Sequence, residues 1–216
     1  MKGSLSRDLH NAIQGKEHII WDWNGTLLDD VAHAIEVMNG LLEEHRLPLI
    51  DRNRYREIFD FPVLSYYRKL GFNFEKESFE SLCHRFVDRF MAGFQSLPLI
   101  PEMKFVLMQL HSEGRIQSVL SATDQVNLNS MISHFGLDKV FTFTFGIDNR
   151  FAGSKVERGR ALVKKSGIGA EKTVIIGDTL HDLEVAKAIG IDAVLISQGH
   201  QCPTRLKPHH DKVIEA

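Results

Sequence analysis

The chain has 216 residues, enough for one α/β domain that carries a modest insertion. Its apolar fraction of 43% is that of an ordinary globular protein, and its net charge of −2 offers no basic footprint for nucleic acid or an anionic membrane surface. It has neither an apolar run long enough to span a bilayer nor a signal-peptide pattern. Cys83 and Cys202 fit no metal or disulfide pattern, so we expect reduced thiols in a cytoplasmic protein.

A buried strand is predicted at 18–22, where the short run HIIWD contains β-branched residues. The polar residues before it predict a loose lead-in or a short helix. The strand ends in a polar turn over 22–26, Asp-Trp-Asn-Gly-Thr.

Residues 31–95 carry helical rather than strand patterns. Apolar residues recur three and four positions apart in two stretches, which places each set on one face of a helix. Pro48 and Pro62 interrupt this segment, because proline lacks an N–H donor and restricts the residue before it. The stretch 96–101 is interpreted as the linker that returns the chain. The two stripes are Val31, Ile35, Met38 and Leu42, followed by Phe79, Leu82, Phe86 and Phe90.

The remainder of the chain alternates strands with helices. This alternation predicts an α/β fold with a Rossmann-like, mostly parallel sheet and helices on both faces. The segment 31–95 is then an α-helical insertion after the first strand, and residues 1–30 and 96–216 form the α/β core. The further strands are predicted at 116–122, 141–146, 173–178 and 193–197, and the helices between them end near Gly114, Gly136, Gly167 and Gly190, the last of them beginning at Asp182.

Polar residues stand at the ends of three predicted strands. Asp22, Ser121 and Asp178 each follow an apolar run. Because ligands of such sheets bind beyond the carboxyl ends of the strands, these side chains are expected to converge on one site.

The same residues suit the hydrolysis of a phosphate ester by a carboxylate nucleophile. Such chemistry needs a divalent cation and a fixed positive side chain to offset the phosphoryl charge, together with hydroxyl and backbone donors. Lys155 stands at a helix start, preceded by Gly153-Ser154, and the segment GDTLHD contains Asp178 and Asp182.

Four motifs in this order resemble those of the haloacid dehalogenase (HAD) superfamily. The segment 22–30, DWNGTLLDD, is similar to the first motif, whose usual form is aspartate, any residue, aspartate, Gly-Thr. Ser121 resembles the second motif, Lys155 the third, and Asp178 with Asp182 the acidic fourth. The four together cover nearly the whole chain and are far more specific than any one of them. The layout is similar to that of phosphoglycolate-phosphatase-like members.

The resemblance implies a nucleophile and a metal ion. Asp22 would attack phosphorus and form an aspartyl-phosphate, with Mg²⁺ as the cofactor and a small phosphorylated metabolite as the substrate. The implied ligands of Mg²⁺ are Asp22, the backbone carbonyl of Asn24, Asp178 and Asp182, the last directly or through water.

The resemblance also implies a substrate site and a cap. Residues 31–95 resemble the mobile C1-type helical cap of the family, which closes over the substrate. Neither the physiological substrate nor the oligomeric state is indicated. The implied substrate-binding residues are Gly25, Thr26, Ser121, Ala122 and Lys155, of which Ser121 and Lys155 would hold the phosphoryl oxygens.

Asn24 departs from the family pattern, which has an aspartate there as general acid and then general base. An amide has no exchangeable proton near neutral pH, and general acid–base help is worth about 10²–10⁴-fold in rate. Three interpretations remain open: substrates with good leaving groups, a substitute proton donor, or a loss of turnover. The candidates for a substitute donor are His181, Asp29, Asp30 and a residue of the cap.

Two alternative functions remain at this point. Phosphonatase or phosphomutase chemistry is one, and for a phosphonatase Lys69 or Lys76 would have to form a Schiff base with the substrate. The other is a protein that binds a phosphorylated ligand with weak catalysis, for which Asn24 is the motivation.

Overall fold

The computed structural model describes residues 5–147 and 155–215. Within them, a sheet of six strands has the order β3-β2-β1-β4-β5-β6, and every neighbouring pair is parallel. The predicted strands are present, and the chain past 199 adds the sixth. The strands are β1 His18–Trp21, β2 Ile116–Asp124, β3 Phe143–Ile147, β4 Thr173–Gly177, β5 Asp192–Ile196 and β6 Val213–Ile214.

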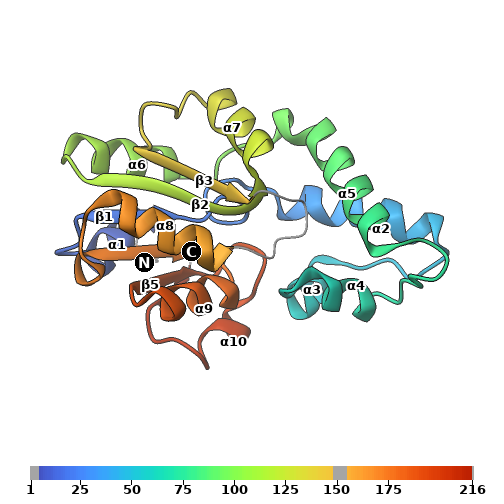
Figure 1. Cartoon of the computed structure of the whole chain (residues 1–216). Coiled ribbons are helices and arrows are strands. Elements are labelled where there is room, and N and C mark those ends of the chain that lie inside the picture. The colour runs from blue at the N-terminus through green and yellow to red at the C-terminus, as the bar shows by residue number, and fades with distance from the viewer. Residues whose placement is uncertain (1–4, 148–154, 216) are drawn as a thin grey trace.

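Helices cover both faces of the sheet (Figure 1). Along β1, Ile19 and Trp21 pack into the hydrophobic cluster of one face and Ile20 into that of the other, because successive side chains of a strand alternate. The expected α/β fold with a parallel sheet is confirmed. The first face carries α1 Leu5–Ala12, α6 Met103–Ser112 and α7 Gln125–His134, and the second carries α8 Lys155–Ser166, α9 Leu180–Ile189 and α10 Pro203–Leu206.

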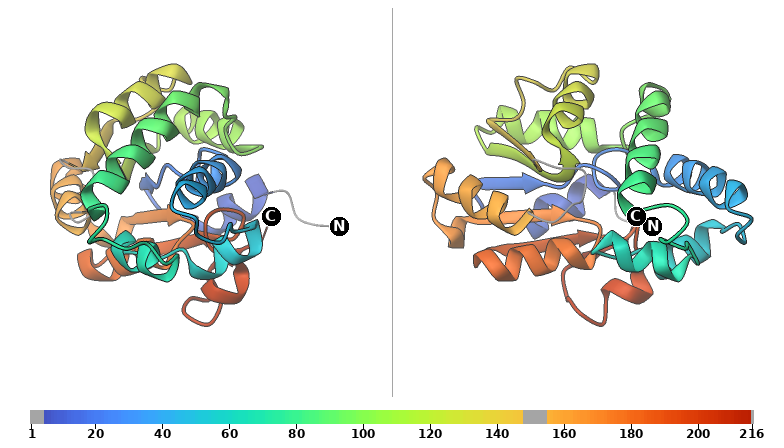
Figure 2. Two further views of the ribbon diagram at one scale, coloured as in Figure 1. Left: turned by 90° about the vertical axis from the view of Figure 1, so that its right-hand side faces the viewer. Right: turned by 45° about the vertical axis from the view of Figure 1, so that its right-hand side comes forward.

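Four further helices form a cap beyond the carboxyl ends of the strands, on the side to which the arrowheads point (Figures 1 and 2). Residues 31–95, all described, contain no strand, as predicted. The predicted apolar stripes face inward: Met38 and Leu42 of the first stripe and Leu82 and Phe90 of the second are buried in the same hydrophobic cluster. The exact bounds of the cap as a domain stay a prediction. Its helices are α2 Val31–Glu44, α3 Arg52–Ile58, α4 Val63–Lys69 and α5 Phe79–Gly93.

The two connections between sheet and cap pair with each other. The amide of Ile100 donates to the carbonyl of Leu27 over 2.8 Å, and the amide of Asp29 donates to that of Pro98 over 3.0 Å. Leu28 and Leu99 form an isolated antiparallel bridge. The predicted linker 96–101 therefore runs beside the chain that leaves β1, so both connections enter the cap at one place.

Several element boundaries differ from the sequence prediction, three of them by two residues. β3 begins at Phe143 rather than at 141, because its pairing with β2 starts opposite Ser118 and a register shift then carries it on to Ile147. α9 begins at Leu180 rather than at Asp182, because Thr179 caps it and the Asp182 side chain reaches back to the Thr179 amide. β2 runs on to 124.

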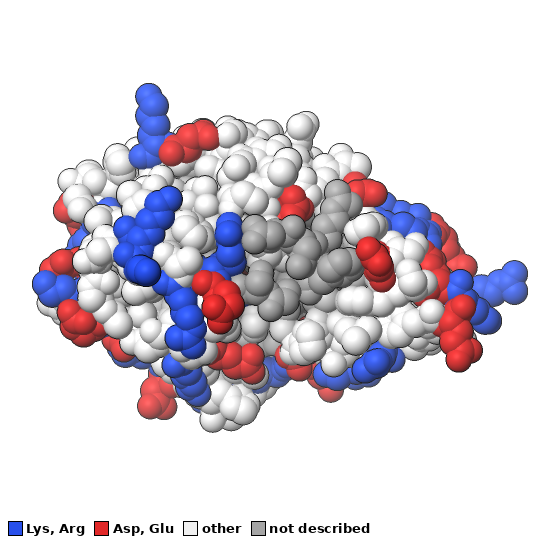
Figure 3. Space-filling model, in the orientation of Figure 1, with Lys and Arg blue, Asp and Glu red and all other residues white. Residues whose placement is uncertain are grey.

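Charge is distributed without a dominant sign on the face drawn in Figure 3, where basic and acidic side chains are interspersed. None of the helices in the described part of the chain has the length and apolar character needed to cross a bilayer.

Candidate active site

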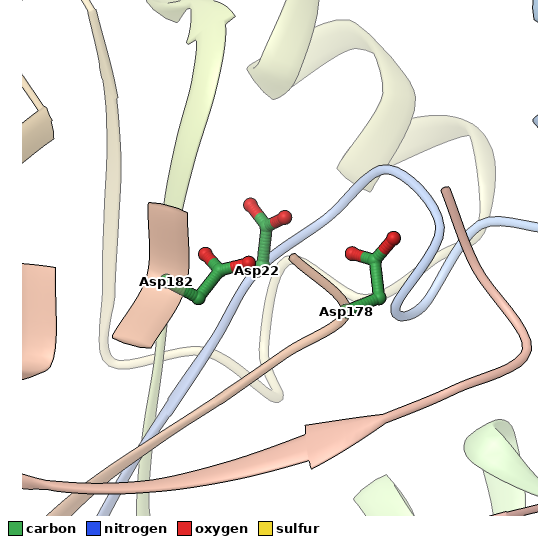
Figure 4. Close-up of side chains that lie close together, drawn as sticks. All are labelled: Asp22, Asp178 and Asp182. Carbon is green, nitrogen blue, oxygen red and sulfur yellow. The ribbon is translucent and has the colours of Figure 1, made fainter. Parts of the chain in front are cut away.

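Three buried carboxylates meet at the carboxyl edge of the sheet. Asp22 follows β1 and Asp178 follows β4, the two neighbouring strands between which the order of the sheet reverses. Asp182 lies in the first turn of α9. Figure 4 shows the three side chains projecting in the same direction from adjacent segments. One oxygen from each lies within 4.8 Å of the others.

Lys155 neutralises part of this cluster. It is the first residue of α8 and 3% exposed, and its ammonium group donates to Asp22 Oδ1 over 2.8 Å and to Asp182 Oδ1 over 2.6 Å. Burial lowers the pKa of this amine, but the two carboxylates outweigh burial and raise it above its ordinary value. Lys155 is therefore a permanent cation beside Asp22.

The carboxyl groups themselves respond unequally to burial. Burial raises the pKa of Asp22 to about 7, against the lowering effect of Lys155 and with a contribution from the other two carboxylates. Burial likewise raises the pKa of Asp178 to about 6. For Asp182, burial is outweighed by the charge and hydrogen bond of Lys155 and by the Thr179 hydroxyl, so its pKa is lowered. One lysine is too little positive charge for three buried acids.

Asp178 is held in a close-fitting frame. Its Oδ1 accepts from the Thr26 hydroxyl over 2.8 Å, and its Oδ2 accepts from the His200 amide over 2.6 Å. Gly25 has a φ of +70°, and a Cβ there would lie 2.4 Å from Asp178 Oδ2; a Cβ on Gly199 would lie 2.2 Å from the same atom. The sequence therefore needs glycine on both sides of this carboxylate.

Ser121 and Ala122 lie where the β2–β3 register shifts. Both line the cavity described below, and Ser121 is buried. The Ser121 hydroxyl accepts from the Thr123 amide over 3.1 Å. Irregularities of this kind redirect side chains next to active sites, and here the strand end faces Asp22.

Both ends of the Asn24 amide are occupied. Its nitrogen donates to Asp30 Oδ2 over 2.7 Å, and its oxygen accepts from the Thr123 hydroxyl over 2.8 Å. Asp30 Oδ1 also accepts from the Gly25 amide over 2.7 Å. Asp30 is therefore buried against the turn that carries Asn24, whereas Asp29 is exposed.

Sequence reasoning missed His200 and Tyr55. His200 Nε2 lies 3.3 Å from Asp30 Oδ1, and its Nδ1 shares a hydrogen bond of 2.7 Å with the Tyr55 hydroxyl. Burial lowers the pKa of His200, but Asp30 and the nearby Asp178 and Asp22 raise it to about 9. No local pattern in the sequence marks these residues, since 145 positions separate His200 from Tyr55. The available signal was Gly199, a glycine directly before His200 that permits close approach of the backbone to Asp178.

A cavity of ≈ 190 Å³ lies between the sheet edge and the cap. Its floor is formed by Asp22, Asn24, Ser121 and Lys155, with Asp30 and His200 at one side. Its walls come mainly from α2, α4 and α5 of the cap. A cavity of this size, with apolar walls and a few polar groups at its floor, is typical of a binding site for a small molecule.

The fold agrees with comparison to known proteins. The model of the haloacid dehalogenase-like hydrolase family matches residues 19–196. The chain belongs to this family. It is 24% identical over 185 residues to a phosphoglycolate phosphatase of Synechococcus elongatus, with 84% of each chain covered. It is 26% identical over 207 residues to a Dickeya dadantii protein named "Probable phosphatase IndB", with 92% of this chain and 89% of the relative covered.

A solved structure gives the same result for the fold. A haloacid dehalogenase-like hydrolase of Streptococcus pneumoniae has a TM-score of 0.79 at 19% identity, covering 93% of this chain and 94% of that one. The resemblance and the fold class predicted from the motifs are confirmed. As a member of this family the chain is a hydrolase, as its motifs predicted.

Several other residues that the sequence predicted to act in the site of this HAD-like hydrolase lie away from the cavity. Gly25 and Thr26 are buried beside Asp178 rather than among the lining residues, so their part in substrate binding stays a prediction. His181 stacks on Phe61 at 4.6 Å between ring centroids and does not line the cavity. The predicted Gly153-Ser154 lead-in to Lys155 lies outside the described residues.

Proposed function

We propose that this chain is a magnesium-dependent phosphatase of a small phosphorylated metabolite, acting through an aspartyl-phosphate on Asp22. The observation that carries the proposal is the contact of Asp22 with Lys155 over 2.8 Å at the floor of the cavity between sheet and cap, beside Asp178 and Asp182. A carboxylate nucleophile, a fixed cation and an acidic cluster are what transfer from a phosphate ester requires.

The donor set fits Mg²⁺. Three carboxylates with oxygens within 4.8 Å of one another offer only oxygen ligands, and burial, with the neighbouring carboxylates, raises the pKa of Asp22 and of Asp178, a shift that a bound cation would oppose. Asp22, Asp178, Asp182 and the backbone carbonyl of Asn24 would hold the ion. When bound, it would supply a Lewis acid that offsets the charge of the phosphoryl group.

The residues of the chain carry out transfer of the phosphoryl group and hydrolysis of the aspartyl-phosphate. An Asp22 oxygen forms a bond to phosphorus as the ester P–O bond breaks, and the departing alkoxide takes up a proton. Water then attacks the aspartyl-phosphate, releasing inorganic phosphate and restoring the Asp22 carboxylate. Lys155 and the Ser121 hydroxyl, with the backbone beside Ala122, hold the phosphoryl oxygens during both steps.

Asn24 sets the limit on this chemistry. Because its amide donates to Asp30 and accepts from Thr123, it is fixed beside the nucleophile but offers no proton to exchange. Cleavage of an ester with a poor leaving group therefore proceeds without proton transfer from this residue, and hydrolysis of the aspartyl-phosphate is slowed more than its formation.

A phosphonatase of this layout would need a lysine of the cap in the cavity, and none of the described lining residues is one. Among the described lining residues the only lysine is Lys155. Lys69 lies 3.6 Å from Asp60 in an ion pair, and Lys76 is exposed. Phosphate binding with weak catalysis remains the second candidate, because the Asn24 amide has no proton to exchange and cannot act as the general acid and base that an aspartate would be at this position.

The test is a screen of phosphorylated metabolites and acetyl phosphate, with and without Mg²⁺, on wild type, Asp22→Ala and Asn24→Asp. Release that needs Mg²⁺ and vanishes in Asp22→Ala supports the proposal. Release that persists in Asp22→Ala and in excess chelator contradicts it. Phosphate binding without release from any variant would favour the second candidate.

A further inference from the structure

We propose that the substrate of this site is the phosphate monoester of an uncharged, ring-bearing and largely apolar alcohol. The inference rests on the proposed phosphatase function and concerns the part of the cavity that the phosphoryl group does not fill.

The cap contributes no charged side chain to the cavity wall. Every lining residue from 31–95, all of which are described, is aliphatic, aromatic or cysteine. Such a wall gives an apolar group contacts and gives a charged group nothing to replace its water. The wall includes Met38, Phe61, Val63, Phe86, Val87 and Met91.

The cationic side chains of the cap are directed elsewhere. Arg85 forms ion pairs with Glu44 and Glu77, and Arg56 donates to the backbone carbonyls of Ser197 and Gln201. Lys69 is paired with Asp60. A second anionic group on the substrate would find no partner among them.

The positive charges that do line the cavity are already matched. Among the described lining residues these are Lys155, which contacts Asp22 and Asp182, and His200, which contacts Asp30. Lys155 belongs to the floor and His200 lies at one side of it, where the proposed function places the phosphoryl group. A substrate carboxylate or second phosphate would be buried against apolar side chains without a counter-ion, which is costly.

One polar atom in the wall is left without a partner. The Tyr66 hydroxyl is buried and has no hydrogen-bond partner, and Tyr66 lines the cavity at 2% exposure. The Tyr55 hydroxyl, by contrast, is bonded to His200. Buried hydroxyls are normally satisfied, so Tyr66 marks the place where one polar atom of the ligand would lie.

The size of the cavity limits the ligand. It measures ≈ 190 Å³ with the floor around Asp22 and Lys155 included, and an apolar cavity of roughly 150 Å³ holds benzene. A phosphoryl group and one ring therefore occupy the whole cavity.

Binding of two non-hydrolysable ligands to the wild-type chain with Mg²⁺ tests the inference without relying on catalysis. Benzylphosphonate and phosphonoacetate share the phosphonate group and differ in carrying a ring or a carboxylate. We expect calorimetry to show benzylphosphonate bound about 10-fold or more tightly, from burial of the ring and the cost of an unpaired carboxylate. Equal affinity, or tighter binding of phosphonoacetate, overturns the proposal.

A charge placed in the wall supplies a matched second test. Met91→Arg should shift the ratio of the two affinities towards phosphonoacetate by about 10-fold. Leu49→Arg, at a 60% exposed position of the cap outside the cavity, should leave the ratio as in wild type. A ratio that moves equally in both variants contradicts the assignment of the wall.

The polar position has its own test. Among the pyridin-2-, 3- and 4-ylmethyl phosphonates, at least one should bind wild type about 5-fold more tightly than benzylphosphonate, and Tyr66→Phe should abolish that difference. The same difference in Tyr66→Phe as in wild type removes Tyr66 from the proposal.

Turnover separates this inference from the proposed function. Failure of wild type to release phosphate from benzyl phosphate and acetyl phosphate overturns the phosphatase assignment, whereas the phosphonate affinities still decide what the wall accepts. Asp22-dependent release that is faster from phosphoglycolate than from benzyl phosphate overturns the substrate class and leaves the phosphatase assignment intact.

Discussion

The amide nitrogen of Asn24 donates to Oδ2 of Asp30 over 2.7 Å, and both residues line the cavity next to Asp22. An aspartate at position 24 would place a second carboxylate against Asp30 in a buried site. Like charges at this distance cannot both ionise without cost. Asn24 thus donates a hydrogen bond to an acidic neighbour six residues away. Changing Asn24 alone to aspartate would replace that hydrogen bond with repulsion between two carboxylates.

We expect an exchange of the two side chains to restore acid–base help better than a single change. The double variant Asn24→Asp/Asp30→Asn retains the hydrogen bond between positions 24 and 30 and the net charge. Its carboxyl group now stands at position 24, beside Asp22. The kcat/KM for benzyl phosphate, a poor leaving group, should rise about 10-fold or more, whereas that for 4-nitrophenyl phosphate should change little.

The single variants provide the comparison. Asn24→Asp should gain less than the double variant, because its new carboxylate faces Asp30. Asp30→Asn alone should not gain at all. If the double variant accelerated hydrolysis of both esters equally, the gain would not come from protonation of the leaving group, and the account given for Asn24 would be wrong.

Asp22 should make the metal-free protein less stable as the pH rises. The pKa of Asp22 is about 7 in the folded chain against an ordinary 3.8, mainly because of burial. Between these values the folded state binds more protons than the unfolded state, so stability falls from about pH 4 to pH 7 and is level above. Asp22→Asn does not titrate there, and its advantage in Tm should grow over this window.

Thermal unfolding in chelator from pH 4.5 to pH 8 measures this effect. Asp211→Asn, an exposed position near the end of the chain, is the control and should follow wild type. Addition of Mg²⁺ at pH 8 should raise the Tm of wild type more than that of Asp22→Asn. An Asp22→Asn advantage that is independent of pH would contradict the account.

The strands and the edge that carries the site were predictable because the signals are local. The apolar runs of β1 and β4 are short and end in aspartate, and parallel strands bring such ends together. By contrast, the start of β3 depends on pairing with Ser118, and β6 depends on an edge that β5 leaves open. Neither is written in the residues of the strand itself.

The residues of the site were likewise predictable only where the signal lies in the local sequence. Asp22, Lys155 and Asp178 could be placed by motif and order, although their roles stay predictions. The partners of Asn24 could be found only in part: Asp30 lies nearby in sequence, whereas Thr123 is 99 positions away. The wall of the cavity is built from helices whose apolar stripes look like ordinary core, and sequence periodicity does not separate a core face from a ligand face.

Closure of the cap should depend on Arg56. This α3 side chain donates to the backbone carbonyls of Ser197 and Gln201, which belong to the sheet domain. Arg56→Met removes both donors, so we expect KM to rise about 5-fold or more as the closed state loses population, with a smaller change in kcat. Hydrogen exchange of the segment 197–201 should increase in parallel.

Arg54→Met is the matched control for this change. Arg54 lies on the same helix, but its ion pair is with Glu57 within the cap, at 2.9 Å on the surface. It should leave KM unchanged, since exposed pairs contribute little. A rise in KM of the same size in both variants would indicate a general loss of helix α3 instead of a lost contact to the sheet domain.

The frame around Asp178 should be intolerant of a single methyl group. A Cβ at Gly199 would lie 2.2 Å from Asp178 Oδ2 and 2.4 Å from the Gly25 carbonyl oxygen, so one of them must move. Gly199→Ala should weaken Mg²⁺ binding about 10- to 100-fold, because shifting the support of a ligand costs that much in metal affinity. Gly40→Ala, in the middle of α2 with its nearest neighbour at 3.5 Å, should bind Mg²⁺ as wild type does and gain stability by about 0.5–1 kcal/mol. Calorimetric titration with Mg²⁺ distinguishes the two, and unchanged affinity in Gly199→Ala would mean that Asp178 is not held in place for a metal ion.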